Sequence, residues 1–298
     1  MKTLKLYFII SLIGSVFVSC DLFFPYSLED APAPTEKNDP PVDDTPVDDP
    51  FDTGKPEKPE GIFFSIAANK FVRFSSGNLQ YNADQDVWRF APNQYDFIGE
   101  KNSNISSAYT GWIDLFGWGT GDSPTKKSTK DTDYTYFTDW GNNHIGNDAK
   151  NTWRTLTSDE WKYLRSRSSS LKGLGSIEGV KGMILLPDNW ERPSGVTFNS
   201  GLGDGFSQNE YSKEKWQLME SAGAVFLPAA GYRYGTSYYS DYGKYWSNTC
   251  ILLYDQYRED YLGDCYYYYD FNSKTEYVEY NVERPYYGYS VRLVKDIQ

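Results

Sequence analysis

Residues 21–60 cannot form a hydrophobic core, and this confines folding to the rest of the chain. The segment holds nine of the chain's fifteen prolines and twelve acidic residues against three lysines. Runs such as Asp39–Asp44 and Lys55–Glu60 are too charged and proline-rich for burial to offset the entropy of ordering. We therefore expect an extended acidic tether here, followed by one folded domain over residues 61–298.

Most of the chain's negative charge belongs to this tether. The whole chain has a net charge of −12, to which the tether contributes −9 and residues 1–20 contribute +2, leaving −5 for residues 61–298. A mildly acidic domain lacks the basic patch that nucleic acid or an anionic membrane surface requires. We therefore expect neither nucleic acid nor a charged bilayer among its partners.

Residues 1–20 are typical of an export signal. Lys2 and Lys5 precede an apolar run over 6–18, which is too short for a spanning helix. The following Ser19-Cys20 resembles the bacterial lipobox, which implies that Cys20 is acylated and becomes the mature first residue. An ordinary signal peptide cleaved nearby is the alternative. Because no second apolar run of spanning length occurs, a lipid would be the sole membrane contact, and we expect an outer-membrane protein at the cell surface.

Only two cysteines follow Cys20, and the chain has one histidine. Cys250 and Cys265 form either a disulfide, which export permits and which would contribute about 3 kcal/mol, or two buried thiols. His144 alone argues against histidine-dependent triads, zinc sites and proton relays.

The domain contains two clear helix signals. Thr157 and Glu160 form a capping box before a helix whose apolar face carries Trp161 and Leu164. A second helix is predicted over 212–222, with Gly223 ending it.

The remaining pattern predicts short strands separated by turns. They lie at Ile62–Ala67, Lys70–Ser75, Trp88–Ala91, Gly182–Leu186, Ala224–Leu227, Tyr266–Phe271, Thr275–Tyr280 and Ser290–Val294. Asn272-Ser273-Lys274 predicts a hairpin turn, and the alternation in Ser290–Val294 predicts a last strand. Two helices among short strands and long connections indicate the α+β class.

Five phrases in order resemble bacterial C-type-lectin-like proteins, in particular the major paralogous domain lipoproteins of Bacteroidetes-type gut bacteria. They are Trp153–Trp161, Ile184–Asp188, Phe226–Arg233, Tyr245–Thr249 and Gly288–Val294. These modules are similar to the formylglycine-generating-enzyme domain and to retroelement-diversified ligand-binding proteins. The resemblance implies a C-type-lectin-like fold over residues 61–298, in which the final strand pairs with earlier ones. It also implies an exposed binding face between the Trp246-Ser247-Asn248-Thr249 phrase and that last strand.

The resemblance does not carry an activity or a metal to this chain. Formylglycine-generating relatives hold copper with two closely spaced thiolates, whereas Cys250 and Cys265 are fifteen residues apart. Calcium-dependent sugar binding needs six to eight oxygen ligands, and no Glu-Pro-Asn loop occurs. The loop 201–205 reads better as a turn than as a calcium site. We therefore expect no enzyme, no cofactor and no metal.

Tyrosine distinguishes the carboxyl-terminal region. Residues 232–298 contain eighteen of the twenty-seven tyrosines. Within the run Tyr266–Tyr269, alternation along a strand predicts that Tyr267 and Tyr269 pack inward with Phe271 while Tyr266 and Tyr268 face outward.

Exposed tyrosines mixed with asparagine, aspartate, serine and glycine resemble antibody binding sites in composition, because they combine rigid aromatic area with adaptable hydrogen bonds. We predict a face that binds an extracellular protein or glycan. Its residues are Tyr242, Asn248, Tyr254, Asp255, Tyr257, Arg258, Tyr261, Tyr268, Glu279, Asn281, Arg284, Tyr286 and Tyr287. The alternative is that these tyrosines simply suit strands and half-buried loops.

The nine tryptophans are expected in the core. A second binding hypothesis is that an exposed pair among Trp112, Trp118 and Trp140 stacks on a sugar ring. Two other functions stay open besides monomeric ligand recognition. One is a structural subunit of a surface or fimbrial assembly, and the other is a formylglycine-type enzyme.

Overall fold

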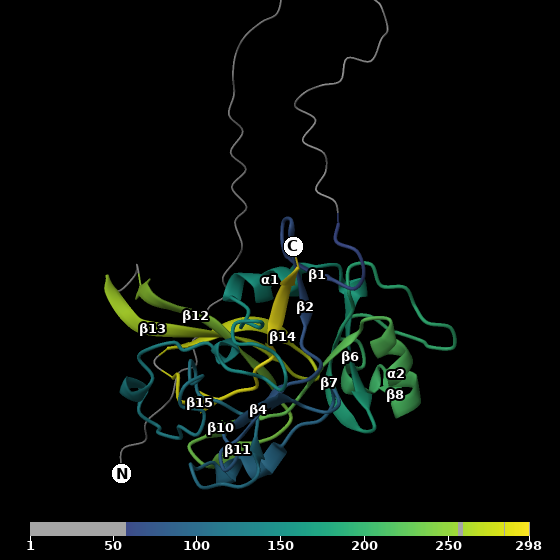
Figure 1. Ribbon diagram of the computed structural model, residues 1–298. Helices are drawn as coiled ribbons and strands as arrows, with labels where there is room; N and C mark the ends of the chain where they lie inside the picture. Colours follow the sequence, from purple (N-terminus) through teal and green to yellow (C-terminus); the bar gives the residue numbers. More distant parts are fainter. Residues whose placement is uncertain (1–57, 256–258, 283, 298) are drawn as a thin grey trace, which may run out of the picture. The chain divides into compact units, whose positions relative to one another are not determined.

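The two ends of the domain meet in one small antiparallel sheet. The computed structural model describes residues 58–255, 259–282 and 284–297, all within a unit that spans Thr53–Gln298. Strands β1 (Phe64–Ala67), β2 (Lys70–Phe74) and β16 (Val294–Ile297) lie in the order β1-β2-β16, so the last strand pairs with the second. Figure 1 shows β1 and β2 beside the carboxyl terminus.

A four-stranded sheet with a helix against it forms one side of the domain (Figure 1). Its order is β8 (Glu210–Tyr211), β6 (Lys172–Ile177), β7 (Val180–Leu185) and β9 (Val225–Pro228), antiparallel except between β6 and β8. Helix α2 (Lys213–Ser221) packs against it through Trp216 and Met219, which share a core with Ile184 and Phe226.

Both helix predictions are confirmed. Helix α1 spans Ser158–Ser166 and begins with the complete capping box of Thr157 and Glu160, and its buried face carries Trp161 and Leu164. The Ser212 side chain caps α2, and Gly223 ends it at a φ of 91°, which favours glycine.

A long ribbon projects from the opposite side of the domain (Figure 1). Strands β12 (Gly243–Asp255), β13 (Asp260–Phe271) and β14 (Glu276–Val282) pair in that order. The predicted hairpin turn joins β13 to β14, with Asn272 Oδ1 accepting hydrogen bonds from the amides of Lys274 and Thr275. Because β14 pairs with β13 only as far as Cys265, the outer end of the ribbon is two-stranded over its described part.

Two further three-stranded sheets complete the described part of the fold. One has the order β4 (Val87–Phe90), β3 (Leu79–Asn82), β5 (Trp112–Ile113), and the other has the order β11 (Ser237–Tyr239), β10 (Tyr232–Tyr234), β15 (Tyr287–Gly288). The connections between these elements contain the 3-10 helices η1 (Gly99–Asn104), η2 (Asp131–Asp133), η3 (Trp140–Asn142), η4 (Ser169–Leu171) and η5 (Gly205–Ser207). The class is α+β with mostly short antiparallel strands, as expected.

The last strand begins later than the sequence predicts. Residues 290–293 are fully buried and make isolated bridges and tertiary hydrogen bonds, and β16 starts only at Val294. The polar positions of the alternating pattern lie inside, where Arg292 donates to Gln94 (2.8 Å) and Asn78 (3.5 Å). The alternation of polar and apolar residues that predicted a strand here therefore belongs to a segment whose polar side chains are buried.

The tyrosine run of β13 is covered on both faces, so half of its predicted orientation is wrong. Tyr269 and Phe271 face the core beneath α1, where Tyr269 stacks on Trp161 at 4.8 Å. Tyr266 and Tyr268 are not outward but lie in a second core with Trp246. The prediction assumed a one-sided sheet, whereas the connections of the domain supply a second apolar layer.

Most tryptophans are core residues, as expected. Trp88, Trp118, Trp140, Trp161, Trp216 and Trp246 are buried, and Trp112, Trp153 and Trp190 are half-buried. The proposed exposed pair is therefore absent, since Trp118 and Trp140 are buried and the Arg89 guanidinium covers Trp112 at 3.6 Å. Among the residues that the structure describes, no helix combines the length and apolar character needed to cross a bilayer.

Candidate functional site

Six tyrosine rings lie together on and beside the β11-β10-β15 sheet. This tyrosine cluster consists of Tyr232, Tyr234, Tyr239, Tyr242, Tyr286 and Tyr287. Tyr232 is central: it stacks on Tyr239 at 4.8 Å and meets Tyr242 and Tyr287 edge-on at 5.7 and 5.8 Å. Tyr234 contacts Tyr286 and Tyr287, each at 5.7 Å. The contacts fix the rings relative to one another.

A hairpin explains why these tyrosines share a surface. Tyr232 and Tyr234 occupy alternate positions of β10, and Tyr232 pairs with Tyr239 of β11. The intervening Arg233 points inward, where its Nε donates to the Leu115 carbonyl (2.8 Å) and its Nη2 to the Lys126 carbonyl (2.9 Å). Desolvation lowers the pKa of Arg233 to about 10. The buried arginine therefore holds the hairpin against the loops below it.

Lys244 lies beneath the cluster and links it to the core. Its ammonium lies 5.8 Å from the Tyr232 ring centroid, 5.6 Å from that of Tyr242 and 4.7 Å from that of Tyr268. It also pairs with Asp270, and both side chains are largely buried. Attraction between the cation and the ring faces adds to this ion pair. The cluster thus has a charged, well-packed support.

Two hydroxyl groups of the cluster have raised pKa values, those of Tyr232 and Tyr286. Burial is the main cause that raises the pKa of Tyr232, and neighbouring tyrosines add to it. Burial likewise raises the pKa of Tyr286. A phenol hydroxyl both donates and accepts hydrogen bonds. The exposed members Tyr234, Tyr239 and Tyr242 therefore present aromatic rings together with hydroxyl groups that can donate or accept hydrogen bonds.

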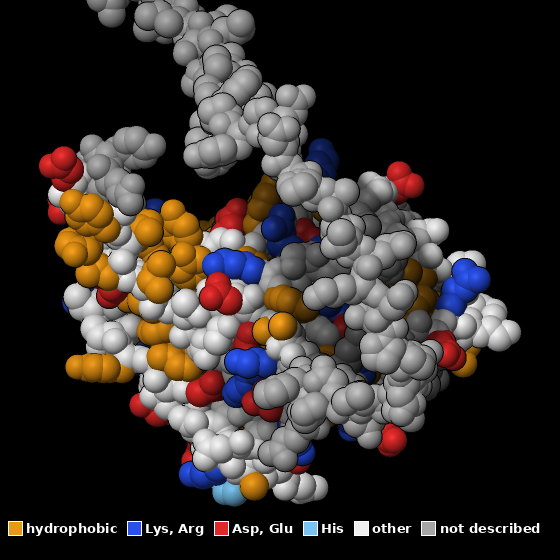
Figure 2. All heavy atoms as spheres, turned by 90° about the horizontal axis from the view of Figure 1, so that it is seen from above, with side chains coloured by type: hydrophobic (Ala, Val, Ile, Leu, Met, Phe, Trp, Pro, Cys, Tyr) orange, Lys and Arg blue, Asp and Glu red, His pale blue; other side chains and the backbone are white. Residues whose placement is uncertain are grey.

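A second apolar surface lies at the end of the projecting ribbon. This ribbon tip consists of Ile251, Leu252, Tyr254 and Tyr261, all exposed. The rings of Tyr254 and Tyr261 meet at 5.1 Å. Figure 2 shows apolar side chains gathered on the side where β12 and β13 project. The tip differs from the cluster because no third strand supports it within the described range.

The register separates the two cysteines of the ribbon. Cys250 lies opposite Tyr266, whereas Cys265 lies opposite Ile251, so their side chains leave opposite faces of the strand pair. The Cys265 thiol donates to the Gly263 carbonyl at 3.7 Å. Burial raises the pKa of Cys250 to about 11, which keeps it a thiol. This arrangement favours two thiols over a disulfide.

The predicted binding residues divide between these places. Tyr242, Tyr286 and Tyr287 lie in the tyrosine cluster, and Tyr254 and Tyr261 lie at the ribbon tip. Tyr257 and Arg258, together with the side chains of Asp255 and Asn281, lie outside the described residues.

Four other predicted residues belong to neither surface. Tyr268 is 4% exposed and belongs to the core, which corrects its assignment to an outer face. Glu279, which accepts a hydrogen bond from the Tyr268 hydroxyl, and Arg284 are exposed. Asn248 is half-buried, and its backbone N–H donates to the Leu156 carbonyl at 3.0 Å. Asn248 therefore ties β12 to the segment that precedes α1.

The predicted set leaves out half of the cluster. Tyr232, Tyr234 and Tyr239 are missing from it, as is the supporting Lys244. A sequence signal existed: tyrosines at 232, 234 and 239 flank Gly235-Thr236, as expected for a tight hairpin with aromatic residues on one face. Lys244 gave no such signal, because only the tertiary structure brings the rings around it.

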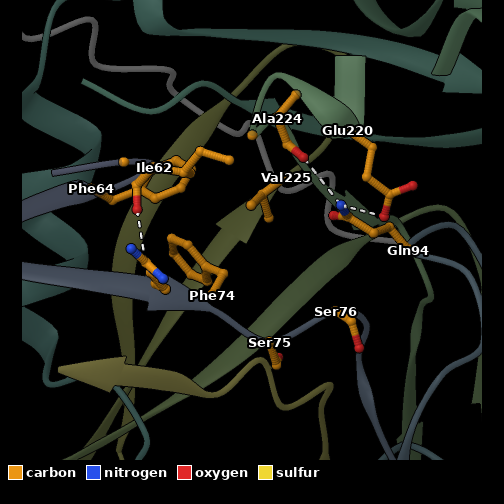
Figure 3. Close-up of a pocket in the computed structure, with 12 residues that line it drawn as sticks. Ile62, Phe64, Phe74, Ser75, Ser76, Gln94, Glu220, Ala224 and Val225 are labelled. Carbon is orange, nitrogen blue, oxygen red and sulfur yellow. Dashed lines mark hydrogen bonds between the residues drawn. The ribbon is translucent and has the colours of Figure 1, made fainter. Parts of the chain in front are cut away.

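A separate pocket of about 430 Å³ lies between β2 and β9, near the start of the described chain. Figure 3 shows its apolar walls of Ile62, Phe74 and Val225. Gln94 at its polar end is fully engaged, donating to Glu220 (2.9 Å) and the Ala224 carbonyl (3.1 Å) while its oxygen accepts from Arg292. The pocket therefore offers shape but few unused polar groups.

Comparison with known proteins finds no matching family, no matching curated protein and no matching solved structure. Within the described ranges, no group of three or more histidine, cysteine, aspartate or glutamate side chains is arranged to hold a metal ion. The geometry of the surfaces is therefore the basis for assigning a function.

Proposed function

We propose that this chain is a lipid-anchored cell-surface protein whose domain recognises an extracellular protein or glycan through the tyrosine cluster. The observation that carries the proposal is the cluster itself, six tyrosine rings in mutual contact, three of them exposed. Rigid aromatic rings lose little conformational entropy on binding, and their hydroxyls adapt to donors and acceptors alike. Such a surface is suited to recognition.

The anchoring and location rest on the sequence. The apolar run before Ser19-Cys20 and the acidic tether that follows are the features of an exported lipoprotein held away from its membrane. We place the protein in the outer membrane, facing outward.

We also propose a C-type-lectin-like fold. The pairing of β16 with β2 supports it, because the final strand of that family returns to pair with earlier strands. Two members of the tyrosine cluster support it as well, since Tyr286 and Tyr287 lie in the segment before the final strand, where that family carries its binding face.

A binding role is favoured over a catalytic one. Copper in formylglycine-type enzymes needs two thiolates at short range, and here the register directs Cys250 and Cys265 to opposite faces. The raised pKa of Cys250 also disfavours the thiolate.

The test uses the full chain, purified in detergent, on arrays of extracellular proteins and glycans. We expect capture of at least one ligand, and we expect Tyr239→Ala combined with Tyr287→Ala to weaken it at least tenfold. Tyr136→Ala is the matched control, because Tyr136 is 85% exposed and lies outside the cluster. Equal binding by the cluster variant and the wild type would refute the proposal.

A structural subunit of a surface assembly is the second candidate, and the ribbon tip favours it. An exposed two-stranded end with Ile251, Leu252 and Tyr261 at its surface is the kind of edge that pairs with another chain. A monomeric full chain at micromolar concentration, judged by sedimentation, favours recognition. Concentration-dependent assembly that Leu252→Lys abolishes favours the structural role.

A further inference from the structure

A polar groove adjoins the tyrosine cluster, and Tyr242 belongs to both. One part of the groove, of about 420 Å³, is lined by Lys181, Phe206, Ser240, Asp241, Tyr242, Asn272 and Ser273. A second part, of about 300 Å³, shares Lys181, Ser240 and Asp241 and extends toward Phe97 and Tyr238. The two hollows therefore meet at the pair formed by Lys181 and Asp241.

Four separate segments build the first part of this groove. Lys181 comes from β7, Phe206 from η5, Asp241 and Tyr242 from the turn before β12, and Ser273 from the turn between β13 and β14. Close backbone contacts hold the turn before β12 in place: the Gly231 amide donates to the Tyr242 carbonyl at 2.7 Å. A side chain at Gly231 would meet the Tyr239 carbonyl oxygen at 2.1 Å, so this approach requires glycine.

Asp241 is held in an unusual conformation with its carboxylate in the groove. Its φ of 68° lies in the left-handed region, which aspartate tolerates better than most residues. One carboxylate oxygen accepts from the Lys181 ammonium and the other from the Ser240 hydroxyl, each at 3.0 Å. These bonds lower the pKa of Asp241, Lys181 being the first cause, and keep it charged.

We propose that this groove binds a short neutral oligosaccharide, with one sugar ring against Tyr242 and the next beside Lys181 and Asp241. The inference rests on the recognition role proposed above and names its ligand class. In this arrangement the polar side chains of the groove bind sugar hydroxyls, and the Tyr242 ring at the edge of the cluster packs against a sugar ring.

The chemistry of the groove favours a sugar over other ligands. A hydroxyl group both donates and accepts, so one sugar hydroxyl can donate to Asp241 and accept from Lys181 at the same time. The Tyr242 ring, which is 41% exposed and lines the groove, offers aromatic area to the apolar C–H face of a pyranose. An acidic sugar or a phosphate would meet the Asp241 carboxylate, and the paired Lys181 leaves no net positive charge to offset it.

The experiment measures binding of the full chain, in detergent, to a printed array of neutral and acidic oligosaccharides. We expect a subset of neutral oligosaccharides to bind. Asp241→Asn should weaken that binding about tenfold to a hundredfold, because a charge-assisted hydrogen bond is lost. Asparagine also tolerates a positive φ, so the turn should keep its shape.

Asp159→Asn is the matched control. Asp159 forms an exposed ion pair with Lys162 at 2.9 Å on α1, so this variant makes the same chemical change away from the groove. Binding should equal that of the wild type. Oligosaccharide binding that Asp241→Asn leaves unchanged would overturn the groove as the site, as would a preference for acidic sugars.

A parallel array of extracellular proteins separates the two proposals. Capture of a protein that depends on Tyr239 and Tyr287, with no neutral oligosaccharide bound, would overturn the groove inference while the recognition role stands. Absence of binding on both arrays by a chain with native circular dichroism would overturn both.

Discussion

The tyrosine cluster and the ribbon tip are made of the same residue type but differ in what lies beneath them. In the cluster, Tyr232 contacts several other rings, with the ion pair of Lys244 and Asp270 below. At the tip, Tyr254 and Tyr261 are 47% and 60% exposed and pair with each other on a two-stranded end. Support from a second layer, rather than tyrosine content, therefore distinguishes a packed aromatic surface from a projecting edge.

The largest effect is expected where the tyrosine run of β13 enters the core. Tyr268→Ala should lower the free energy of unfolding by about 3–5 kcal/mol, because the ring is 4% exposed and lies between Trp246 and Tyr289. Urea denaturation followed by tryptophan fluorescence measures it. Tyr280→Ala, at an exposed position of β14, is the control and should lower the free energy of unfolding by less than about 1 kcal/mol. Equal losses of stability in the two variants would mean that the Tyr268 ring is not packed in the core.

The ion pair under the cluster gives the next largest effect. Lys244→Met leaves the Asp270 carboxylate buried without its partner and should cost about 3 kcal/mol. Adding Asp270→Asn should restore part of that stability, which a double-mutant cycle detects. Lys162→Met removes the cation of an exposed pair and should change stability by less than 1 kcal/mol. If Lys244→Met behaved like Lys162→Met, the cluster would have no special support.

A buried acid beside the cluster makes its stability depend on pH. Asp114 accepts from the Ile98 amide and the Asn102 side chain, which fixes η1, and η1 packs against β11. Desolvation raises the pKa of Asp114 to about 6, and hydrogen bonds from Asn102 and the backbone oppose this. The folded state therefore binds this proton more tightly than the unfolded state does. The stabilisation that this group contributes is present below about pH 4 and is lost as the pH rises through 6.

The measurement compares the wild type with Asp114→Asn, which cannot titrate. From pH 4.5 to pH 7.5, the free energy of unfolding of the wild type should fall relative to that of the variant by about 2 kcal/mol. Hydrogen exchange of β11 should report the same trend, and exchange at the ribbon tip should serve as the internal control. A difference that is constant across this pH range would contradict the shifted pKa.

The smallest effect is expected at the ribbon tip. Tyr261→Ala should change the free energy of unfolding by less than about 0.5 kcal/mol, because the ring is mostly in solvent. Thermal denaturation by circular dichroism is sufficient to measure it. A loss above 2 kcal/mol would show that the tip is packed in solution, as in an assembly, and would remove the contrast between the two regions.

Local sequence signals predicted the helices and several strands but not the faces of the strands. The capping box of Thr157 and Glu160 depends on residues three apart, and the Asn272 turn depends on neighbouring amides, so both could be recognised. Tyr268 could not be placed, because its burial depends on Trp246 and Tyr289, neither of which is a neighbour of Tyr268 in the sequence. The same limit hid the groove, because the walls of its first part alone come from four segments between residues 181 and 273.

The sequence by its own pattern predicted that folding is confined to the residues after the proline-rich acidic segment 21–60, and it specified the local elements that depend on short-range hydrogen bonds. Tertiary structure alone decided which tyrosines face water, since alternation along a strand defines two faces but not which of them another layer covers. For the same reason, the alternation over Ser290–Val294 predicted a strand but could not show that Ser290 and Arg292 lie in the interior.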